Sequence, residues 1–496
     1  MKKTLIPRSR NRDQERGITM LLVALAMVAI IGMAALSIDV ITLYLAREEA
    51  QHSADSAALG AAKVLSLSGI TGDPTNESGN WGHICGPDNG VNGLATRVAK
   101  AIATQNTVGG AVPTTINVTY SAGSASSSLG TSDCTSLNDT AFGVNPVVTV
   151  QIIRTGVPNF FSRIWGSAGN PVSAAASAEA FNPSNSASAG PSGIIPVQPR
   201  CVKPWMVPNL DPLNPTTTCT NNCQPFVALA DGHIINPGIS VSGGNASGVI
   251  GERFLLIPDC RRSITANCTP RIGGILANHG ANGSYVPSKP NLEYLPGQTL
   301  YASAAVPTAA SAGSLYEWAI AGCDQTTVYY CGVPSGSPIG NGPNMVDLSE
   351  NPASTDDTSN GVMALIHQTN PNSNSQPDGQ DTFSPYGSPS SYPFQIFPGS
   401  GNLTGLANTI PITASNSIVS VPIYDQTGNT FTNFSPTPVP VTIVGFLQVF
   451  INATDQYGNV DVTVLNVAGC SNGSGTPVGT AITANSPVPV RLITPP

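Results

Sequence analysis

The longest uninterrupted apolar stretch of the chain runs from Gly17 to Ile38 and contains no charged residue. As a helix, this stretch would extend about 33 Å, which is enough to cross the hydrocarbon core of a bilayer. Six basic and two acidic residues precede it within positions 1–16. An excess of positive charge on one flank holds that flank in the cytoplasm. The pattern therefore predicts a cytoplasmic segment at 1–16, a membrane-spanning helix at 17–39 and an exported remainder.

A cleaved signal peptide is the alternative interpretation of the same stretch. The residues at 32–34 form the small-x-small pattern that signal peptidase cuts after a short apolar core. Apolar residues continue beyond that point to Leu45 without a turn residue, and this continuity favours an uncleaved anchor. A prepilin-type signal would place Glu five residues after Gly17, where the chain has Leu22, so processing as a pilin is not expected.

Directly after the apolar stretch, small residues recur at helical spacing, in alternating steps of three and four. Such spacing places them on one face of a helix over residues 40–65, and small side chains let another backbone approach that face closely. The partner is either the protein's own β-sheet or another subunit, with packing inside the chain preferred; high helix propensity alone is the other explanation. This helix-packing seam consists of Leu43, Ala46, Ala50, Ser53, Ala57, Gly60 and Val64.

Beyond the alanine-rich segment, the apolar positions predict a small α/β unit at 66–181. Helical spacing runs through residues 91–102. Runs rich in β-branched residues at 116–120 and 147–153 indicate two strands, and 172–181 indicates a third.

The rest of the chain is expected to be rich in β-strands and turns. A charge-free segment of Pro, Ser, Gly, Asn and Ala at 182–193 predicts a linker, and residues 194–496 form the C-terminal domain. Two Asp-Gln-x-Gly-Asn strings, at 425–429 and 455–459, predict hairpin turns. The run at 442–451 is too apolar for an edge strand and indicates a central one. The expected fold class is α+β: a transmembrane helix continuing into a long alanine-rich helix, the α/β unit, and this domain.

Composition narrows the class of protein further. Charged residues make up only 10% of the 496 residues, and 50 Gly and 43 Pro are present, which is typical of turn-rich β domains outside the cytoplasm. The net charge of −8 combines +4 over residues 1–16, −4 over 17–181 and −8 over 182–496. No basic patch with interleaved aromatic residues occurs, so nucleic-acid binding is not expected.

The cysteines all follow the apolar stretch, which predicts disulfide bonds formed in an oxidising compartment. We expect Cys85 to pair with Cys134 and the other eight to pair within the C-terminal domain, in a connectivity that the sequence leaves open. A zinc site would need two ligand pairs of the CxxC or HxxxH kind. Only Cys219 and Cys223 come close to forming one such pair. The disulfide candidates are Cys85, Cys134, Cys201, Cys219, Cys223, Cys260, Cys268, Cys323, Cys331 and Cys470.

No GxSxG, HExxH, P-loop or GxGxxG string, the motifs of catalysis or of metal and nucleotide binding, occurs in a usable context. Five histidines are scattered, and His233 and His279, in Gly/Asn-rich loops, are the best placed for a site. Asp455, Asn459 and Asp461 have the chemistry of calcium ligands, but a turn explains Asp and Asn equally well. We therefore expect no enzymatic activity, no cofactor and no metal.

A set of residues at and after the apolar stretch forms a recognisable pattern. It consists of Arg16-Gly17, the apolar run, Ile38-Asp39-Val40, Tyr44, Arg47, Gln51 and the string from Ser53 to Ala62. This pattern resembles the N-terminus of TadG-like Flp pilus-assembly proteins, which read RG, an apolar helix, D-V, Tyr, Arg and then an alanine-rich string. Weaker similarity continues at 99–106, like the family's second helix, and at 157–166, like its P-x-F-F turn.

The resemblance implies a membrane-anchored structural part of the tight-adherence pilus and secretion system. It implies a single-pass protein of the inner membrane, with its bulk in the periplasm and other pilus-assembly proteins, TadE-like ones among them, as partners. Longer relatives carry a von Willebrand A domain with a DxSxS metal motif; the nearest string here, at 347–351, lacks the second serine. The alternative function is a secreted hydrolase or carbohydrate-binding surface protein with a cleaved signal peptide.

Overall fold

The fold is that of a computed structural model of the chain. The described residues are 12–68, 70–72, 81–88, 91–122, 130–137, 142–143, 145–158, 169–180, 196–199, 201–213, 224–229, 234–236, 248–258, 291–297, 314–323, 327–330, 344–348, 356–371, 379–384, 395–402, 415–427, 438–470, 482–484 and 490–493, with a few single residues between them. The predicted linker at 182–193, His233, His279 and most of the string at 347–351 lie outside them.

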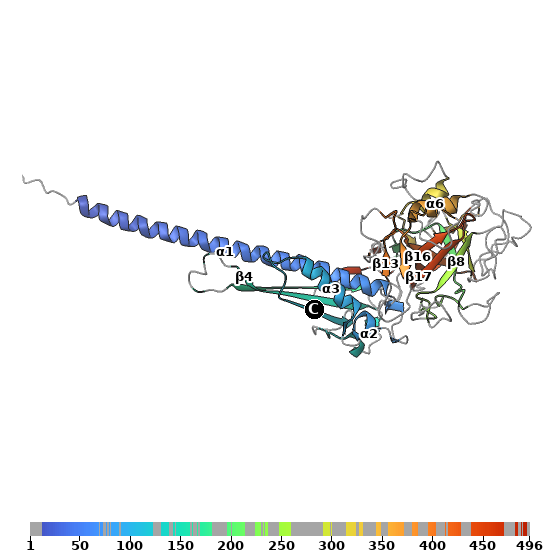
Figure 1. Cartoon of the computed structure of the whole chain (residues 1–496), viewed down its shortest axis with the longest axis horizontal. Coiled ribbons are helices and arrows are strands. Elements are labelled where there is room, and N and C mark those ends of the chain that lie inside the picture. The colour runs from blue at the N-terminus through green and yellow to red at the C-terminus, as the bar shows by residue number, and fades with distance from the viewer. Residues whose placement is uncertain are drawn as a thin grey trace, which may run out of the picture. The chain divides into compact units, whose positions relative to one another are not determined.

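The apolar stretch and the alanine-rich segment form one continuous helix, α1 (Arg12–Leu67), which Figure 1 shows without a break. No proline occurs between positions 8 and 73, so no backbone donor is lost from its hydrogen-bond ladder. Among the described helices only this one, from Thr19, is long and apolar enough to cross a membrane, with a mean hydropathy of 2.7 in its most apolar part. Its apolar side chains from Met20 to Ile31 are exposed, as expected of a helix that faces lipid.

The chain divides into two compact units that interleave along the sequence. Unit 1 comprises Met1–Ala57, Lys100–Asn117 and Val150–Ala176, and unit 2 comprises Ala58–Ala99, Val118–Thr149 and Ser177–Pro496. Helix α1 therefore contributes residues to both. The domain boundaries inferred from the sequence stay a prediction.

The elements that follow α1 resemble the predicted α/β arrangement, with one shift. Val91, which the helical spacing assigned to a helix, lies instead in a two-residue strand, and the helix begins at Leu94. Gly93 precedes that helix so tightly that a Cβ on it would lie 2.7 Å from the backbone nitrogen of Cys85. The elements are η1 (Ile70–Gly72), α2 (Trp81–Ile84), β1 (Pro87–Asp88), β2 (Val91–Asn92), α3 (Leu94–Gln105), β3 (Thr115–Ala122), η2 (Cys134–Ser136), β4 (Pro146–Val157) and β5 (Asn170–Ala180).

Strand β19 (Val490–Ile493), near the end of the chain, joins three of these strands in a four-stranded sheet of order β19-β5-β4-β3. It pairs antiparallel with β5, with Arg491 opposite Glu179. The Arg491 guanidinium donates a hydrogen bond to the Glu179 carboxylate, so an ion pair supports this register.

The core of unit 2 is a closed barrel of six strands in the order β14-β16-β17-β8-β9-β7. The pairs β8–β9 and β14–β7 are parallel, and the other four are antiparallel. Strand β16 pairs on both sides, which agrees with its apolar sequence. The barrel strands are β7 (Trp205–Pro208), β8 (Arg253–Pro258), β9 (Asn291–Pro296), β14 (Ile418–Tyr424), β16 (Ile443–Thr454) and β17 (Val460–Gly469).

Small sheets and two short helices complete unit 2. Helices α5 (Leu315–Ala321) and α6 (Asp357–Ile366) pack closely, since a Cβ on Gly361 would lie 2.8 Å from the carbonyl oxygen of Glu317. The small sheets have the orders β10-β6-β18, β11-β15 and β12-β13. Their strands are β6 (Pro196–Pro199), β10 (Tyr329–Tyr330), β11 (Met345–Val346), β12 (Thr382–Ser384), β13 (Gln395–Phe397), β15 (Val439–Pro440) and β18 (Ile482–Ala484).

Candidate functional site: the packed face of helix α1

One face of α1 beyond the apolar stretch is buried, and it carries the small residues of the seam. Ala50 and Ala57 are 0% exposed, and Ala46, Ser53 and Val64 are buried as well. Leu43 and Gly60, the other two residues of the seam, are half-buried. The seven residues thus share one face of the helix.

The buried face is wider than the seam. Four alanines in the positions next to it are also buried, because a face of an α-helix spans more than the two positions per heptad that the spacing argument selected. The spacing of the seam did not select these residues, although they lie in the alanine-rich string: Ala54, Ala58, Ala61 and Ala62.

Close to the middle of the helix, a tight turn packs against the seam. Gly109 lies in this turn with φ of 58°, a left-handed backbone that favours glycine. Its backbone N–H donates a hydrogen bond to the Glu49 carboxylate at 2.7 Å. A Cβ on Gly109 would lie 3.7 Å from the Cβ of Ala46. The small side chain of Ala46 therefore leaves room for the turn.

Strand β5 contacts the same part of the helix. The side-chain amide of Gln51 donates to the carbonyl oxygen of Ala175 at 3.2 Å and to the carboxylate of Asp55 at 2.8 Å. The second bond joins residues four apart on the helix surface. Gln51 therefore fixes the helix to the sheet while Asp55 orients its side chain.

Where the apolar stretch ends, Asp39 holds a third segment of the chain. Its carboxylate oxygens lie 3.2 Å and 3.3 Å from the backbone nitrogen of Phe161, which donates to them. Asp39 is only 4% exposed, so its charge depends on such donors. Both residues lie in stretches that resemble the pilus-assembly family, but nothing in the sequence pattern indicated that they form a pair. The three contacts, at Asp39, Glu49 and Gln51, all lie inside unit 1.

The C-terminal end of α1 is held inside unit 2. The buried side-chain amide of Asn466, on β17, donates to the carbonyl oxygen of Ser66, and the Ser66 hydroxyl donates to the carbonyl oxygen of Val488 at 2.6 Å. The last carbonyls of a helix lack partners within the helix, so Asn466 supplies one of the missing donors. Nothing in the local sequence pattern indicated this contact.

In two disulfides, both cysteines lie among the described residues. Cys85 and Cys134 are joined with Cα atoms 5.6 Å apart, and Cys201 is joined to Cys323. Cys470 is also disulfide-bonded, and no described cysteine is free. The remaining candidates lie outside the described residues: Cys219, Cys223, Cys260, Cys268 and Cys331.

The three residues considered as calcium ligands take part in other contacts. The Asp455 carboxylate accepts hydrogen bonds from the backbone nitrogens of Tyr457 and Asn459 and from the Asn459 side chain. Asp461 forms a two-bond ion pair with Arg253, each bond 2.8 Å long. The turn thus explains Asp455 and Asn459. Within the described parts of the chain, no three His, Cys, Asp or Glu side chains gather as a metal site.

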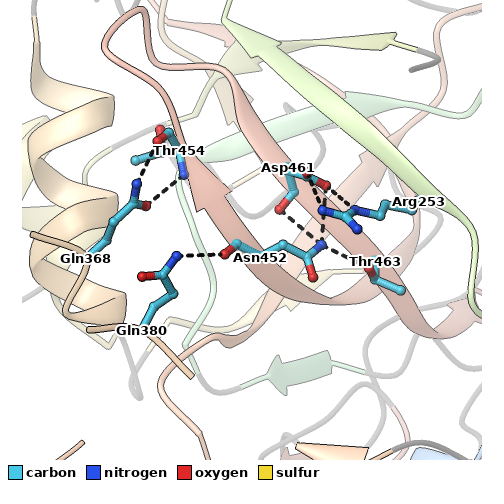
Figure 2. A network of polar contacts seen from close by, with 7 residues as sticks. All are labelled: Arg253, Gln368, Gln380, Asn452, Thr454, Asp461 and Thr463. Carbon is cyan, nitrogen blue, oxygen red and sulfur yellow. Dashed lines mark hydrogen bonds and ion pairs between the residues drawn. The ribbon is translucent and has the colours of Figure 1, made fainter. Parts of the chain in front are cut away.

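The ion pair belongs to a larger polar network on the barrel, shown in Figure 2. The Asn452 side chain donates to Asp461 and Thr463 across neighbouring strands. Gln368, just after α6, forms hydrogen bonds with both the backbone N–H and the carbonyl of Thr454. These bonds join the end of α6 to strand β16. Each hydrogen bond of the network thus holds one segment of the fold to another.

Two acidic side chains are buried near the start of β8. Glu252 is 1% exposed and Asp211 is fully buried. Burial raises the pKa of Glu252 well above its ordinary value, and the negative charge of Asp211 raises this pKa further. Folding therefore shifts Glu252 toward its protonated form, relative to the unfolded chain.

Comparison with known proteins bears on this helix alone. Residues 17–64 match the model of a family described as "Putative Flp pilus-assembly TadE/G-like". The match begins with the apolar stretch and ends at the last residue of the seam, so the resemblance noted in the sequence is confirmed there. No curated protein and no solved structure matches the chain. The match indicates a role in Flp pilus assembly, and the exposed apolar part of α1 indicates membrane anchoring.

Proposed function

We propose that this protein is a non-enzymatic structural component of a tight-adherence pilus assembly or secretion system, anchored by α1 in the inner membrane. One observation carries the proposal: the family match at 17–64 falls on a single helix that is exposed and apolar in its first part and packed in its second. A helix built in this way joins a membrane anchor to a folded body without a flexible connection.

The orientation follows from charge and from cysteine chemistry. The +4 segment at positions 1–16 favours a cytoplasmic N-terminus. Every cysteine follows the apolar stretch, and disulfides form in an oxidising compartment such as the periplasm. Both arguments favour a single-pass topology with the bulk of the chain in the periplasm.

The polar side chains described above form contacts within the chain, and this agrees with a structural role. Asp39, Glu49 and Gln51 hold other segments against the helix, and the network around Asp461 joins barrel strands to one another. Such contacts give a rigid scaffold. The proposed partners are the inner membrane and other pilus-assembly proteins, including TadE-like ones.

Topology and membrane attachment test the proposal. A phosphatase reporter fused after residue 70 should be active, and the protein should stay in the membrane fraction after carbonate extraction. Deletion of the gene should abolish pilus output, and the chain restored from a plasmid should recover it. Recovery of a soluble mature protein starting near Ala35 would instead support a cleaved signal peptide and refute the anchor.

A further inference from the structure

A pocket of about 400 Å³ lies over one face of helix α6 in unit 2. Four of its lining residues follow one another at the spacing that places side chains on one face of a helix: Asn360, Met363, Ala364 and His367. Glu317, on α5, lines the pocket as well. A volume of this size is ordinary for a site that takes a small molecule or one side chain of a partner.

The carboxyl group of Glu317 is buried at this pocket with an oxygen that has no partner. Glu317 is 2% exposed, and within the described part of the chain no group donates a hydrogen bond to its Oε1. A buried carboxylate oxygen without a donor is costly. A ligand that brings a donor to this oxygen would therefore gain binding energy from it.

The place of Glu317 in α5 would ordinarily give its carboxyl group a structural role. Ser314 caps this helix, and its hydroxyl oxygen accepts a hydrogen bond from the backbone N–H of Glu317 at 3.2 Å. A glutamate three residues after a capping serine commonly accepts a bond from the serine N–H in return. The Glu317 Oε1 does not make that bond, and the Ser314 hydroxyl donates to Asp357 at 2.6 Å. Helix capping therefore leaves this oxygen free for the pocket.

The surroundings of Glu317 are negatively charged. Burial raises the pKa of Glu317, and the negative charge of Asp357, in the first turn of α6, raises it further. Three basic side chains are described between positions 194 and 496, and each is bonded to another part of the fold: Lys203, Arg253 and Arg491. The described residues thus supply no positive charge to Glu317, and a cationic ligand would supply it.

The rest of the wall suits an aliphatic stem behind the cation. Met363 and Ala364 present apolar side chains to the pocket, against which methylene groups can pack. The amide oxygen of Asn360 offers a second acceptor. The side chain of Gln368, in contrast, is already bonded to the backbone of Thr454.

His367 is fixed in the wall of the pocket by its backbone. It ends α6 with φ of 62°, a left-handed conformation that residues other than glycine rarely adopt. A Cβ on Gly401 would lie 2.7 Å from the Cβ of His367, and one on Gly379 would collide with its carbonyl oxygen. These close contacts hold the wall in place, so a ligand does not have to order it on binding.

We propose that this pocket binds a primary ammonium group carried on an aliphatic stem. Glu317 is the anionic partner of the ammonium group, Asn360 is a second acceptor, and the stem packs against Met363 and Ala364. A lysine side chain of another polypeptide and a free alkylamine share this chemistry. The site lies entirely in unit 2, so it adds a binding activity to the scaffold that does not depend on how α1 is anchored.

Titration of the full chain with a blocked lysine tests the site. The probe is Nα-acetyl-lysine methylamide, followed by saturation-transfer NMR in micelles of a deuterated detergent. Its control is the norleucine analogue, which has the same stem without the ammonium group. We expect the analogue to bind at least about tenfold more weakly, because the charge-assisted hydrogen bond is lost. Equal affinity for the two, or no binding of the lysine probe, would overturn the proposal.

Three variants locate the bound probe. Glu317→Gln keeps the shape of the side chain and removes its charge, and it should weaken binding about tenfold or more. Asp356→Asn removes one charge from an exposed residue outside the pocket lining and should leave the affinity unchanged in about 0.15 M salt. Ala364→Leu narrows the pocket without a change of charge and should also weaken binding. It gives an answer even if Glu317→Gln fails to fold, and wild-type affinity in the folded variants would overturn the site.

The free diamine putrescine distinguishes the two sources of the ammonium group. Tighter binding of putrescine than of the blocked lysine supports the site with a free amine as its ligand. The reverse order supports the site with a lysine side chain of a partner polypeptide. Binding of putrescine that is unaffected by both Glu317→Gln and Ala364→Leu counts against the pocket.

Discussion

The carboxylate of Asp39 and the backbone N–H of Phe161, 122 residues apart in the chain, are hydrogen-bonded at the end of the apolar stretch. A carboxylate that is almost fully buried is costly unless donors satisfy it. The position of Phe161 therefore depends on the charge that ends the predicted span.

Replacing Asp39 should release Phe161. In Asp39→Leu the amide loses its acceptor, and we expect a loss of about 1–3 kcal/mol in the stability of this contact. Hydrogen–deuterium exchange of the peptide containing Phe161 should become faster, with an intermediate rate in Asp39→Asn, which keeps one acceptor oxygen. Glu48→Gln, at an exposed helix position, is the control. Unchanged exchange in Asp39→Leu would show that the contact does not hold Phe161 in place.

Enlarging the seam should disturb packing inside the chain. Ala50 and Ala57 are fully buried, and Leu at either position keeps helix propensity nearly unchanged while adding volume. Overpacking typically costs about 1–3 kcal/mol per site. We expect the level of intact protein to fall in Ala50→Leu and Ala57→Leu, and pilus output with it.

The control for these variants is Glu48→Leu, which adds a leucine to the exposed face. Normal protein levels together with lost pilus output would identify another subunit as the partner of the seam. Wild-type behaviour of both alanine variants would leave helix propensity as the reason for the alanines.

Removing the disulfide between Cys85 and Cys134 should destabilise the folded protein. The bond closes a loop with a sequence separation of 49, and both sulfurs are buried. For the double variant Cys85→Ala/Cys134→Ala we expect a loss of about 2–4 kcal/mol. Thermal unfolding in detergent measures this loss of stability, and an unchanged unfolding midpoint would contradict it.

The wider prediction is that the ten cysteines form five disulfides. Non-reducing peptide mapping of the wild type tests it, and a majority of free thiols would refute it.

Glu252 should make stability depend on pH. Because its folded pKa is raised above the ordinary 4.5, its contribution is fully present below that value and is lost as pH rises through the folded pKa. Glu252→Gln removes the ionisable group. The variant should therefore gain stability relative to wild type as the pH rises above the ordinary pKa of 4.5, and the difference should shrink below that pH. Melting temperatures of wild type and variant that differ by the same amount at every pH would contradict this.

Local patterns were enough to predict the elements of α1. An uncharged stretch of membrane-spanning length and a helical repeat of small residues are both properties of neighbouring positions, so they are readable without a fold. Runs of β-branched residues likewise located β3 and β4. The seam was predictable as a face for the same reason, although its partner was not.

Only the tertiary structure decided which segments meet. Asn466 caps α1, Arg491 pairs with Glu179, and two parallel strand pairs close the barrel. Each joins positions far apart in the chain through one or two polar groups, or through a strand register that no periodicity specifies. A short periodic pattern of apolar or small residues indicates which face of a helix or strand is buried. The segment that covers that face is selected by the packing of the whole chain, where many weak contacts act together.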